Sequence, residues 1–231
     1  EVPADAPGPH PQIFLFGNDY HWRVAEEPLD SPAGQVDQVS LDRWAGYSPG
    51  LAFAVELLEQ DPSLQIGLIP CAKWSSSIRE WRRNHSDYSL YGSCIKRARA
   101  ASPMGELAGV LFVQGEAEVA DPERFPQKNP EPDKWAEKFT QLVAGLREDL
   151  GDPSLPIVFA QIGPFDHPQK VPEWEIVQAQ QASIQLPGVA MIETADLALL
   201  DEVHFTAESY EIIGARFAQA YGRLAEAADQ E

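Results

Sequence analysis

Short apolar runs recur along the chain, and amphipathic segments separate them. The runs lie at residues 13–16, 65–70, 109–113, 157–161 and 189–193. The last four are apolar almost throughout, which is typical of strands that are buried on both faces. Strands that alternate with helical segments predict an α/β fold, with a parallel sheet covered by helices on both faces.

Apolar positions at helical spacing predict helices over residues 91–101, 132–150, 171–185 and 207–227. A further helix is predicted after Ser48 and Pro49, with Ser48 as N-cap and Pro49 as the first helical residue, ending before Asp61-Pro62. Asp152-Pro153 and Leu186-Pro187-Gly188 are predicted stops. The proline-rich segment 121–133 predicts a surface loop, and without a recognisable linker the chain is expected to form one domain, 1–231.

The amino-acid composition and charge exclude two classes of protein, those that bind nucleic acids and those that span a membrane. The chain carries 36 acidic side chains against 17 lysines and arginines, a formal net charge of −19, so it cannot supply the clustered cations that nucleic-acid binding needs. No run of about 18 apolar residues is present, which excludes a membrane-spanning segment. The first residues lack the features of a signal peptide, and the cellular compartment is left open.

The two cysteines, Cys71 and Cys94, allow either one disulfide or two buried thiols. The sequence alone does not choose between them. Cysteine commonly behaves as a small buried hydrophobe, so two buried thiols are the simpler interpretation.

In open α/β sheets ligands bind beyond the carboxyl ends of the strands, so the residues that follow each strand are the place to look for chemistry. We expect four such segments to surround one cleft: 71–77, 114–116, 163–167 and 201–204.

Asp201 and His204 lie three residues apart, directly before the helix that is predicted from residue 207. A carboxylate and an imidazole in one short turn can meet, and the carboxylate then orients the ring as a general base for a hydroxyl nucleophile. The alternative is a helix-entry aspartate with an unrelated surface histidine. Two ligands do not make a metal site, so no metal is predicted.

Gln114-Gly115-Glu116 follows the apolar run 110–113, where a side-chain amide beside a glycine suits donation to an oxyanion. The alternative is a strand-end turn with a solvated glutamine. For Ser75, Ser76 and Ser77 the simple interpretation is a loop that caps the next helix, with Ile78 and Trp81 packed inward. His167 is interpreted as a loop residue.

Five segments that follow one another along nearly the whole chain carry recognisable motifs. They are Asn18-Asp19-Tyr20 through Trp22 to Glu27-Pro28-Leu29; Ile66-Gly67-Leu68-Ile69-Pro70-Cys71-Ala72; Ser76-Ser77-Ile78 with Glu80-Trp81; Gln114-Gly115-Glu116; and Asp201-Glu202-Val203-His204-Phe205-Thr206. Each motif alone is weak, and five in the correct order are specific. Together they resemble the SGNH (GDSL-like) hydrolases of the sialate O-acetylesterase type, close to carbohydrate esterase family six.

The resemblance implies a three-layer, flavodoxin-like fold and a Ser-His-Asp esterase that removes acetyl groups from carbohydrates without metal or cofactor. It implies that His204 is the general base, that Asp201 orients it, and that Gln114 is an oxyanion-hole donor. Trp74 and Glu116 are candidate substrate contacts, Trp74 because a loop tryptophan can stack on a sugar ring.

The sequence departs from the family in two places. The family's nucleophile lies in a Gly-Gln-Ser-Asn motif on the first strand, and this motif is absent, so the strand and its serine are expected upstream of residue 1, on a separate segment, or lost. In the oxyanion loop the family usually has Gly-Gly where this chain has Trp74-Ser75, which leaves Ser75 as the oxyanion-loop candidate. A substitute nucleophile among Ser75 to Ser77 is a further alternative.

The sequence also allows a non-catalytic function. A chain without its nucleophile and with an altered oxyanion loop is compatible with a non-catalytic carbohydrate-binding protein on a degenerate SGNH fold. A nucleotide-binding protein is not favoured, because no glycine-rich phosphate loop follows any predicted strand.

Overall fold

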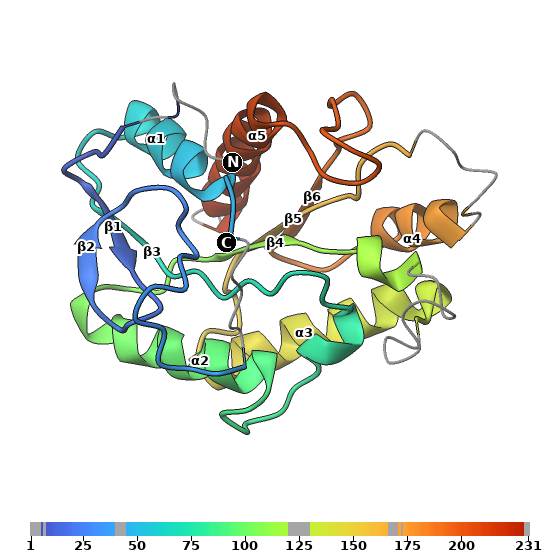
Figure 1. Cartoon of the computed structure of the whole chain (residues 1–231), viewed down its shortest axis with the longest axis horizontal. Coiled ribbons are helices and arrows are strands. Elements are labelled where there is room, and N and C mark those ends of the chain that lie inside the picture. The colour runs from blue at the N-terminus through green and yellow to red at the C-terminus, as the bar shows by residue number, and fades with distance from the viewer. Residues whose placement is uncertain are drawn as a thin grey trace. The chain divides into compact units, whose positions relative to one another are not determined.

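The computed structural model describes residues 6, 8–39, 45–119, 130–165, 171 and 173–228. Helices and strands alternate along most of the chain (Figure 1). The chain divides into two compact units, each of which contains one sheet in its described part. The first unit comprises Glu1–Trp74, Asn84–Leu107 and Ala207–Gln219, and the second comprises Ser75–Arg83, Ala108–Thr206 and Ala220–Glu231.

The first unit contains a sheet in the order β2-β1-β3, formed by β1 (Ile13–Phe16), β2 (Trp22–Val24) and β3 (Ile66–Leu68). β1 pairs in parallel with β3 and antiparallel with β2. Helices α1 (Gly50–Gln60) and α2 (Leu90–Ala101) lie on opposite sides of this sheet (Figure 1). The sequence did not predict β2, because three residues with mostly exposed side chains show no recognisable period.

The core of the first unit joins α1 to the sheet. Leu51, Ala54 and Leu58 form an apolar stripe on α1 that packs against Ile13 and Leu15 of β1. The predicted N-cap is displaced by one residue, since α1 begins at Gly50 and Pro49 occupies the cap. The Ser48 hydroxyl still accepts a hydrogen bond from the Gly50 amide at 3.3 Å, so it contributes to the helix start without being the cap.

The second unit contains the parallel sheet β4-β5-β6, formed by β4 (Val110–Val113), β5 (Ile157–Ala160) and β6 (Val189–Ile192). Val110 lies beside Ile157, which lies beside Val189. All four residues of β5 are buried because β5 is the central strand. These parallel pairs confirm the predicted strand positions and the α/β class.

Helix α3 (Trp135–Leu150) supplies the aromatic core of the second unit. The Trp135 and Phe139 rings stack with centroids 4.8 Å apart, and Phe139 lies 4.7 Å from the ring of Phe159 on β5. Phe112 on β4 contacts the same cluster at 5.6 Å from Phe139. Helix α4 (Glu173–Ala182) completes the unit, and α5 (Ala207–Ala228) begins in the first unit and ends in the second.

Two glycines with positive φ lie at turns where the sequence predicted stops. Gly151 adopts φ +79° after α3, and its amide and that of Asp152 both bond to the Arg147 carbonyl. Gly188 adopts φ +66° directly before β6. A residue with a Cβ is strained in this left-handed region, so glycine is suited to both turns.

Two sequence predictions fall on segments that the structure does not cover. Most of the loop at 121–133 and His167 lie outside the described residues. Among the residues that are described, no helix combines the length and the apolar character needed to cross a bilayer.

A disulfide joins Cys71, in the segment after β3, to Cys94 on α2. The interpretation of two buried thiols was therefore wrong. The pairing depends on a contact between residues 23 positions apart, which no local pattern specifies. The bond anchors the segment that leads to Trp74 on a helix.

We expect the paired Cys71→Ser and Cys94→Ser substitutions to lower the free energy of unfolding by about 3 kcal/mol, because the cross-link restricts a 23-residue loop in the unfolded chain. Urea denaturation of the oxidised protein and the double variant measures this difference. An equal midpoint and slope for the two proteins would contradict the prediction.

Candidate active site

The segment between β6 and α5 holds Asp201 and His204 in a closed turn. Leu199 and Phe205 form an antiparallel bridge across its base, and the Leu200 amide bonds to the His204 carbonyl at 2.7 Å. The Phe205 ring is buried and packs so closely on Gly163, after β5, that a Cβ there would lie 2.8 Å from it. The bridge and the packing of Phe205 thus fix the base of the turn.

Within this turn the two predicted side chains meet. His204 Nδ1 lies 2.7 Å from Asp201 Oδ2, and Asp201 Oδ1 accepts hydrogen bonds from the amides of Val203 and His204 at 2.9 and 2.8 Å. Both side chains are about half exposed, at 52% for His204 and 53% for Asp201. The geometry therefore combines a fixed imidazole with access to solvent.

The electrostatics of Asp201 favour its ionised form. Partial burial raises its pKa, but the hydrogen bonds from Val203 and His204 outweigh this effect, so the pKa lies below its ordinary value. An ionised carboxylate only accepts hydrogen bonds, so His204 Nδ1 carries the proton. Nε2 is then the basic nitrogen, which is the tautomer a general base requires.

The loop that contains the three serines begins the second unit. Ser75 adopts φ +55°, a conformation that favours glycine. Trp74, directly before it, has 60% of its surface exposed. The backbone therefore retains a glycine-like geometry at Ser75, even though the sequence has no glycine there.

Ser76 and Ser77 have structural partners, as the capping interpretation predicted. The Ser77 amide donates to Glu80 Oε2 at 2.8 Å in a capping box of the 3-10 helix Ile78–Trp81. The Ser76 hydroxyl accepts a hydrogen bond from the Trp81 indole at 3.0 Å. Both serines are buried, which disfavours either as a substitute nucleophile.

Gln114 follows β4 and is 6% exposed. Its Nε2 donates to the Ser76 carbonyl at 3.0 Å and to Glu118 Oε1 at 2.9 Å, while its Oε1 accepts from the Trp135 indole at 2.9 Å. A side-chain amide has two protons, and both are engaged here. Donation to an oxyanion would require one of these bonds to be given up, and the bonds as they stand join Gln114 to the serine loop and to Glu118.

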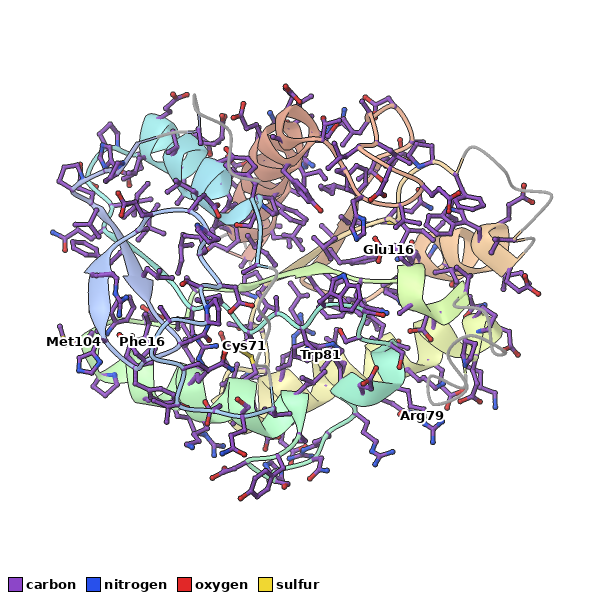
Figure 2. All side chains as sticks on the ribbon, in the orientation of Figure 1. Phe16, Cys71, Arg79, Trp81, Met104 and Glu116 are labelled. Atoms are coloured by element: carbon purple, nitrogen blue, oxygen red, sulfur yellow. A yellow bond between two sulfur atoms is a disulfide. The ribbon has the colours of Figure 1, made fainter. Side chains whose placement is uncertain are left out.

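Glu116 lies just beyond the carboxyl end of β4 (Figure 2). Burial of its carboxyl raises its pKa, and His204 opposes this shift when its ring is protonated. The two side chains are thus close enough to interact electrostatically.

The sequence did not identify the side chains of α4 that fix the strand ends. Gln181 Nε2 donates to the Gln114 carbonyl at 3.1 Å, and its Oε1 accepts from the Ile162 amide at 2.9 Å. The Trp174 indole and Gln178 Nε2 both donate to the Gly163 carbonyl. Two glutamines at helical spacing, 178 and 181, were the available signal in the sequence. Gln181 is buried, and its two bonds join the segments that follow β4 and β5.

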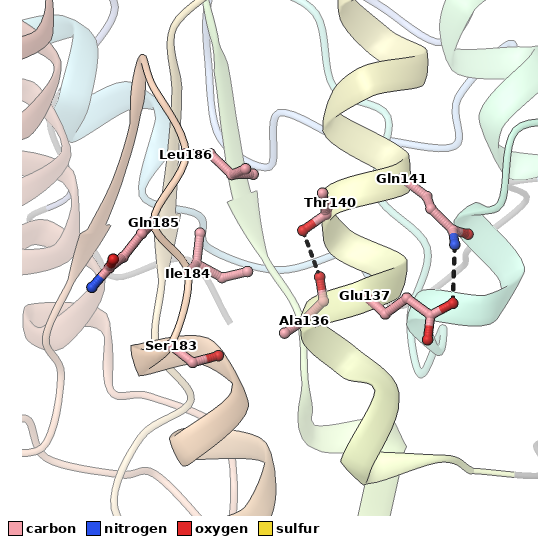
Figure 3. Close-up of a pocket in the computed structure, with 8 residues that line it drawn as sticks. All are labelled: Ala136, Glu137, Thr140, Gln141, Ser183, Ile184, Gln185 and Leu186. Carbon is pink, nitrogen blue, oxygen red and sulfur yellow. Dashed lines mark hydrogen bonds between the residues drawn. The ribbon is translucent and has the colours of Figure 1, made fainter.

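The structure also contains a shallow pocket of about 460 Å³ between α3 and the segment after α4 (Figure 3). Thr140 bonds to the Ala136 carbonyl and Gln141 to Glu137, so these polar side chains are satisfied within the helix. None of the sequence-predicted site residues lines this pocket. In the part of the chain that the structure covers, no group of three or more histidine, cysteine or acidic residues is arranged to hold a metal.

Comparison with known proteins adds independent information. A family model described as carbohydrate esterase, sialic acid-specific acetylesterase matches residues 1–223. A probable carbohydrate esterase of Arabidopsis thaliana is 32% identical over 224 residues, which cover 92% of this chain and 75% of that protein.

Three solved structures have folds similar to that of this chain. A protein from Arabidopsis thaliana superposes with a TM-score of 0.77 at 30% identity, over 94% of this chain and 82% of that one. A carbohydrate acetylesterase from Xanthomonas citri gives 0.67 at 20% identity, over 94% of this chain and 50% of that one. The protein NanS gives 0.66 at 15% identity, over 94% and 89% respectively. The last two likenesses confirm the fold.

Proposed function

Because the chain belongs to the sialic acid-specific acetylesterase family of carbohydrate esterases, we propose that it removes O-acetyl groups from carbohydrates by a Ser-His-Asp mechanism. Membership makes it a carboxylic-ester hydrolase on an SGNH-type α/β fold. The O-acetylated substrate, the Ser-His-Asp mechanism and the residues that carry it out are our proposal. The observation that carries them is the 2.7 Å contact between His204 Nδ1 and Asp201 Oδ2, which presents Nε2 as a base.

In this mechanism a serine hydroxyl attacks the acetyl carbonyl while His204 Nε2 takes its proton. The tetrahedral intermediate collapses, and His204 returns the proton to the departing sugar oxygen. Water then attacks the acetyl-serine, again losing a proton to His204, and acetate leaves as the serine regains its proton. Asp201 keeps the ring in place and stabilises its protonated form.

The proposed nucleophile is a serine outside the present sequence, since no Gly-Gln-Ser-Asn motif occurs in it. Among the described residues β4 pairs only with β5, so its second edge is open. An edge of unpaired backbone groups is a suitable position for a further strand. We assign the oxyanion to the backbone amides of the loop at Ser75, with Trp74 and Glu116 contacting the sugar.

Labelling of the complete protein with a fluorophosphonate tests this function. The expected result is a single adduct on a serine outside the present sequence, together with hydrolysis of an acetylated sugar. An adduct within Ser75–Ser77 would overturn the assigned nucleophile. No adduct and no hydrolysis would favour carbohydrate binding instead. A titration with acetylated and free sugars, followed by tryptophan fluorescence, then examines that binding.

A further inference from the structure

Glu118 is a buried acidic residue that the proposed mechanism does not use. It lies in the 3-10 helix Glu116–Val119, just beyond the carboxyl end of β4, and only 1% of its surface is exposed. A glutamate is rarely buried to this extent unless its oxygens have defined partners.

One oxygen of Glu118 accepts two hydrogen bonds. The Ile78 amide donates to Glu118 Oε1 at 2.6 Å, and Gln114 Nε2 donates to the same oxygen at 2.9 Å. The other proton of Gln114 Nε2 goes to the Ser76 carbonyl. Glu118 and Gln114 therefore hold the serine loop at two backbone positions, one on each side of Ser77.

The second oxygen differs. Glu118 Oε2 is buried and has no hydrogen-bond partner among the residues that the structure describes. Burial raises the pKa of Glu118, and the negative charge of Glu80 adds to this, whereas the bonds from Ile78 and Gln114 and the positive charge of Lys138 oppose it. Both contacts use Oε1 alone, so a neutral side chain with one acceptor oxygen can replace the carboxyl.

We propose that Glu118 is a positioning residue for the esterase reaction, which fixes the backbone of the Ser75–Ile78 loop through Ile78 and through Gln114. Its role rests on the proposed function, because the loop matters for rate only if its amides receive the acyl oxygen. Oxyanion stabilisation depends on donors held in place before the reaction, and a displacement of about 1 Å can cost roughly 100-fold in rate.

Three variants of the complete protein test the proposal. Glu118→Leu keeps the volume and removes the acceptor, and we expect kcat to fall roughly 100-fold with KM changed less than about threefold. Glu118→Gln keeps the acceptor oxygen, and we expect it to restore kcat to within about threefold of the wild type. Glu137→Leu is the matched control, and we expect unchanged kinetics. Glu137 is an exposed glutamate on α3, and its one side-chain hydrogen bond among the described contacts is to Gln141 at 3.2 Å.

Amide hydrogen exchange at Ile78 is the second readout, and we expect faster exchange in Glu118→Leu than in Glu118→Gln. Wild-type kcat in a folded Glu118→Leu protein would overturn the proposal, and so would a Glu118→Gln protein as slow as Glu118→Leu. If the Glu118→Leu protein does not fold, Glu118→Asp is tested instead, because its shorter side chain moves the acceptor oxygen away from Ile78 and Gln114. A wild-type kcat in Glu118→Asp would refute the positioning role of Glu118. If the wild-type protein itself is inactive, the proposed esterase function is refuted. That result differs from every outcome that concerns only the Glu118 variants.

Discussion

Replacement of His204 by alanine is expected to lower kcat/KM of the complete protein for an acetylated sugar by about 10³- to 10⁴-fold, close to the background rate. The imidazole is the only group in the proposed mechanism that moves protons, so its loss affects both the formation and the hydrolysis of the acyl-enzyme. Steady-state hydrolysis of a simple acetyl ester and of an acetylated sugar measures the loss.

The chain offers a matched control for this variant. His21 also lies near an aspartate, with Nδ1 2.8 Å from the Asp19 carbonyl and 3.8 Å from Asp19 Oδ2, and it is exposed. We expect His21→Ala to keep wild-type turnover. Equal turnover in His204→Ala and wild type would show that the Asp201–His204 pair is not the catalytic pair.

Phe159→Ala is expected to lower the free energy of unfolding by about 3–5 kcal/mol. The Phe159 ring is 1% exposed on the central strand β5, and it contacts Trp135 at 5.6 Å and Phe139 at 4.7 Å between ring centroids. Alanine would leave a cavity that these large rings cannot fill without moving. Trp135 also donates to Gln114, so the same cavity is expected to loosen the bracing of the serine loop.

Urea denaturation, with tryptophan fluorescence as the probe, measures this effect. Ile176→Ala on α4 is the matched control, because Ile176 is 41% exposed and its truncation leaves no cavity. A change within about 0.5 kcal/mol is expected for it. A loss below about 1 kcal/mol for Phe159→Ala would mean that the aromatic cluster is not a tightly packed core.

The polar side chains that support the candidate site come from elements far apart in the sequence. Gln181 on α4 links the segments after β4 and β5, and Gln114 and Glu118 link the segment after β4 to the serine loop. Buried hydrogen bonds of this kind fix the backbone segments that they join.

The sequence by itself determined what depends on near neighbours. Short apolar runs indicated β1 and β3 to β6, and the helical spacing of apolar residues indicated the α-helices, because both patterns follow from local backbone geometry. The Asp201–His204 contact was predictable for the same reason, since the two residues lie three positions apart in one turn. The five ordered motifs also pointed to the family that the comparisons confirm.

Only the tertiary structure decided the contacts between distant segments. The pairing of Cys71 with Cys94, the engagement of both Gln114 protons and the burial of Glu118 depend on which segments the fold brings together. A cysteine, a glutamine or a glutamate looks the same in sequence whether it is solvated or buried. The free energy that fixes its role comes from desolvation and hydrogen bonds formed only when the chain has folded.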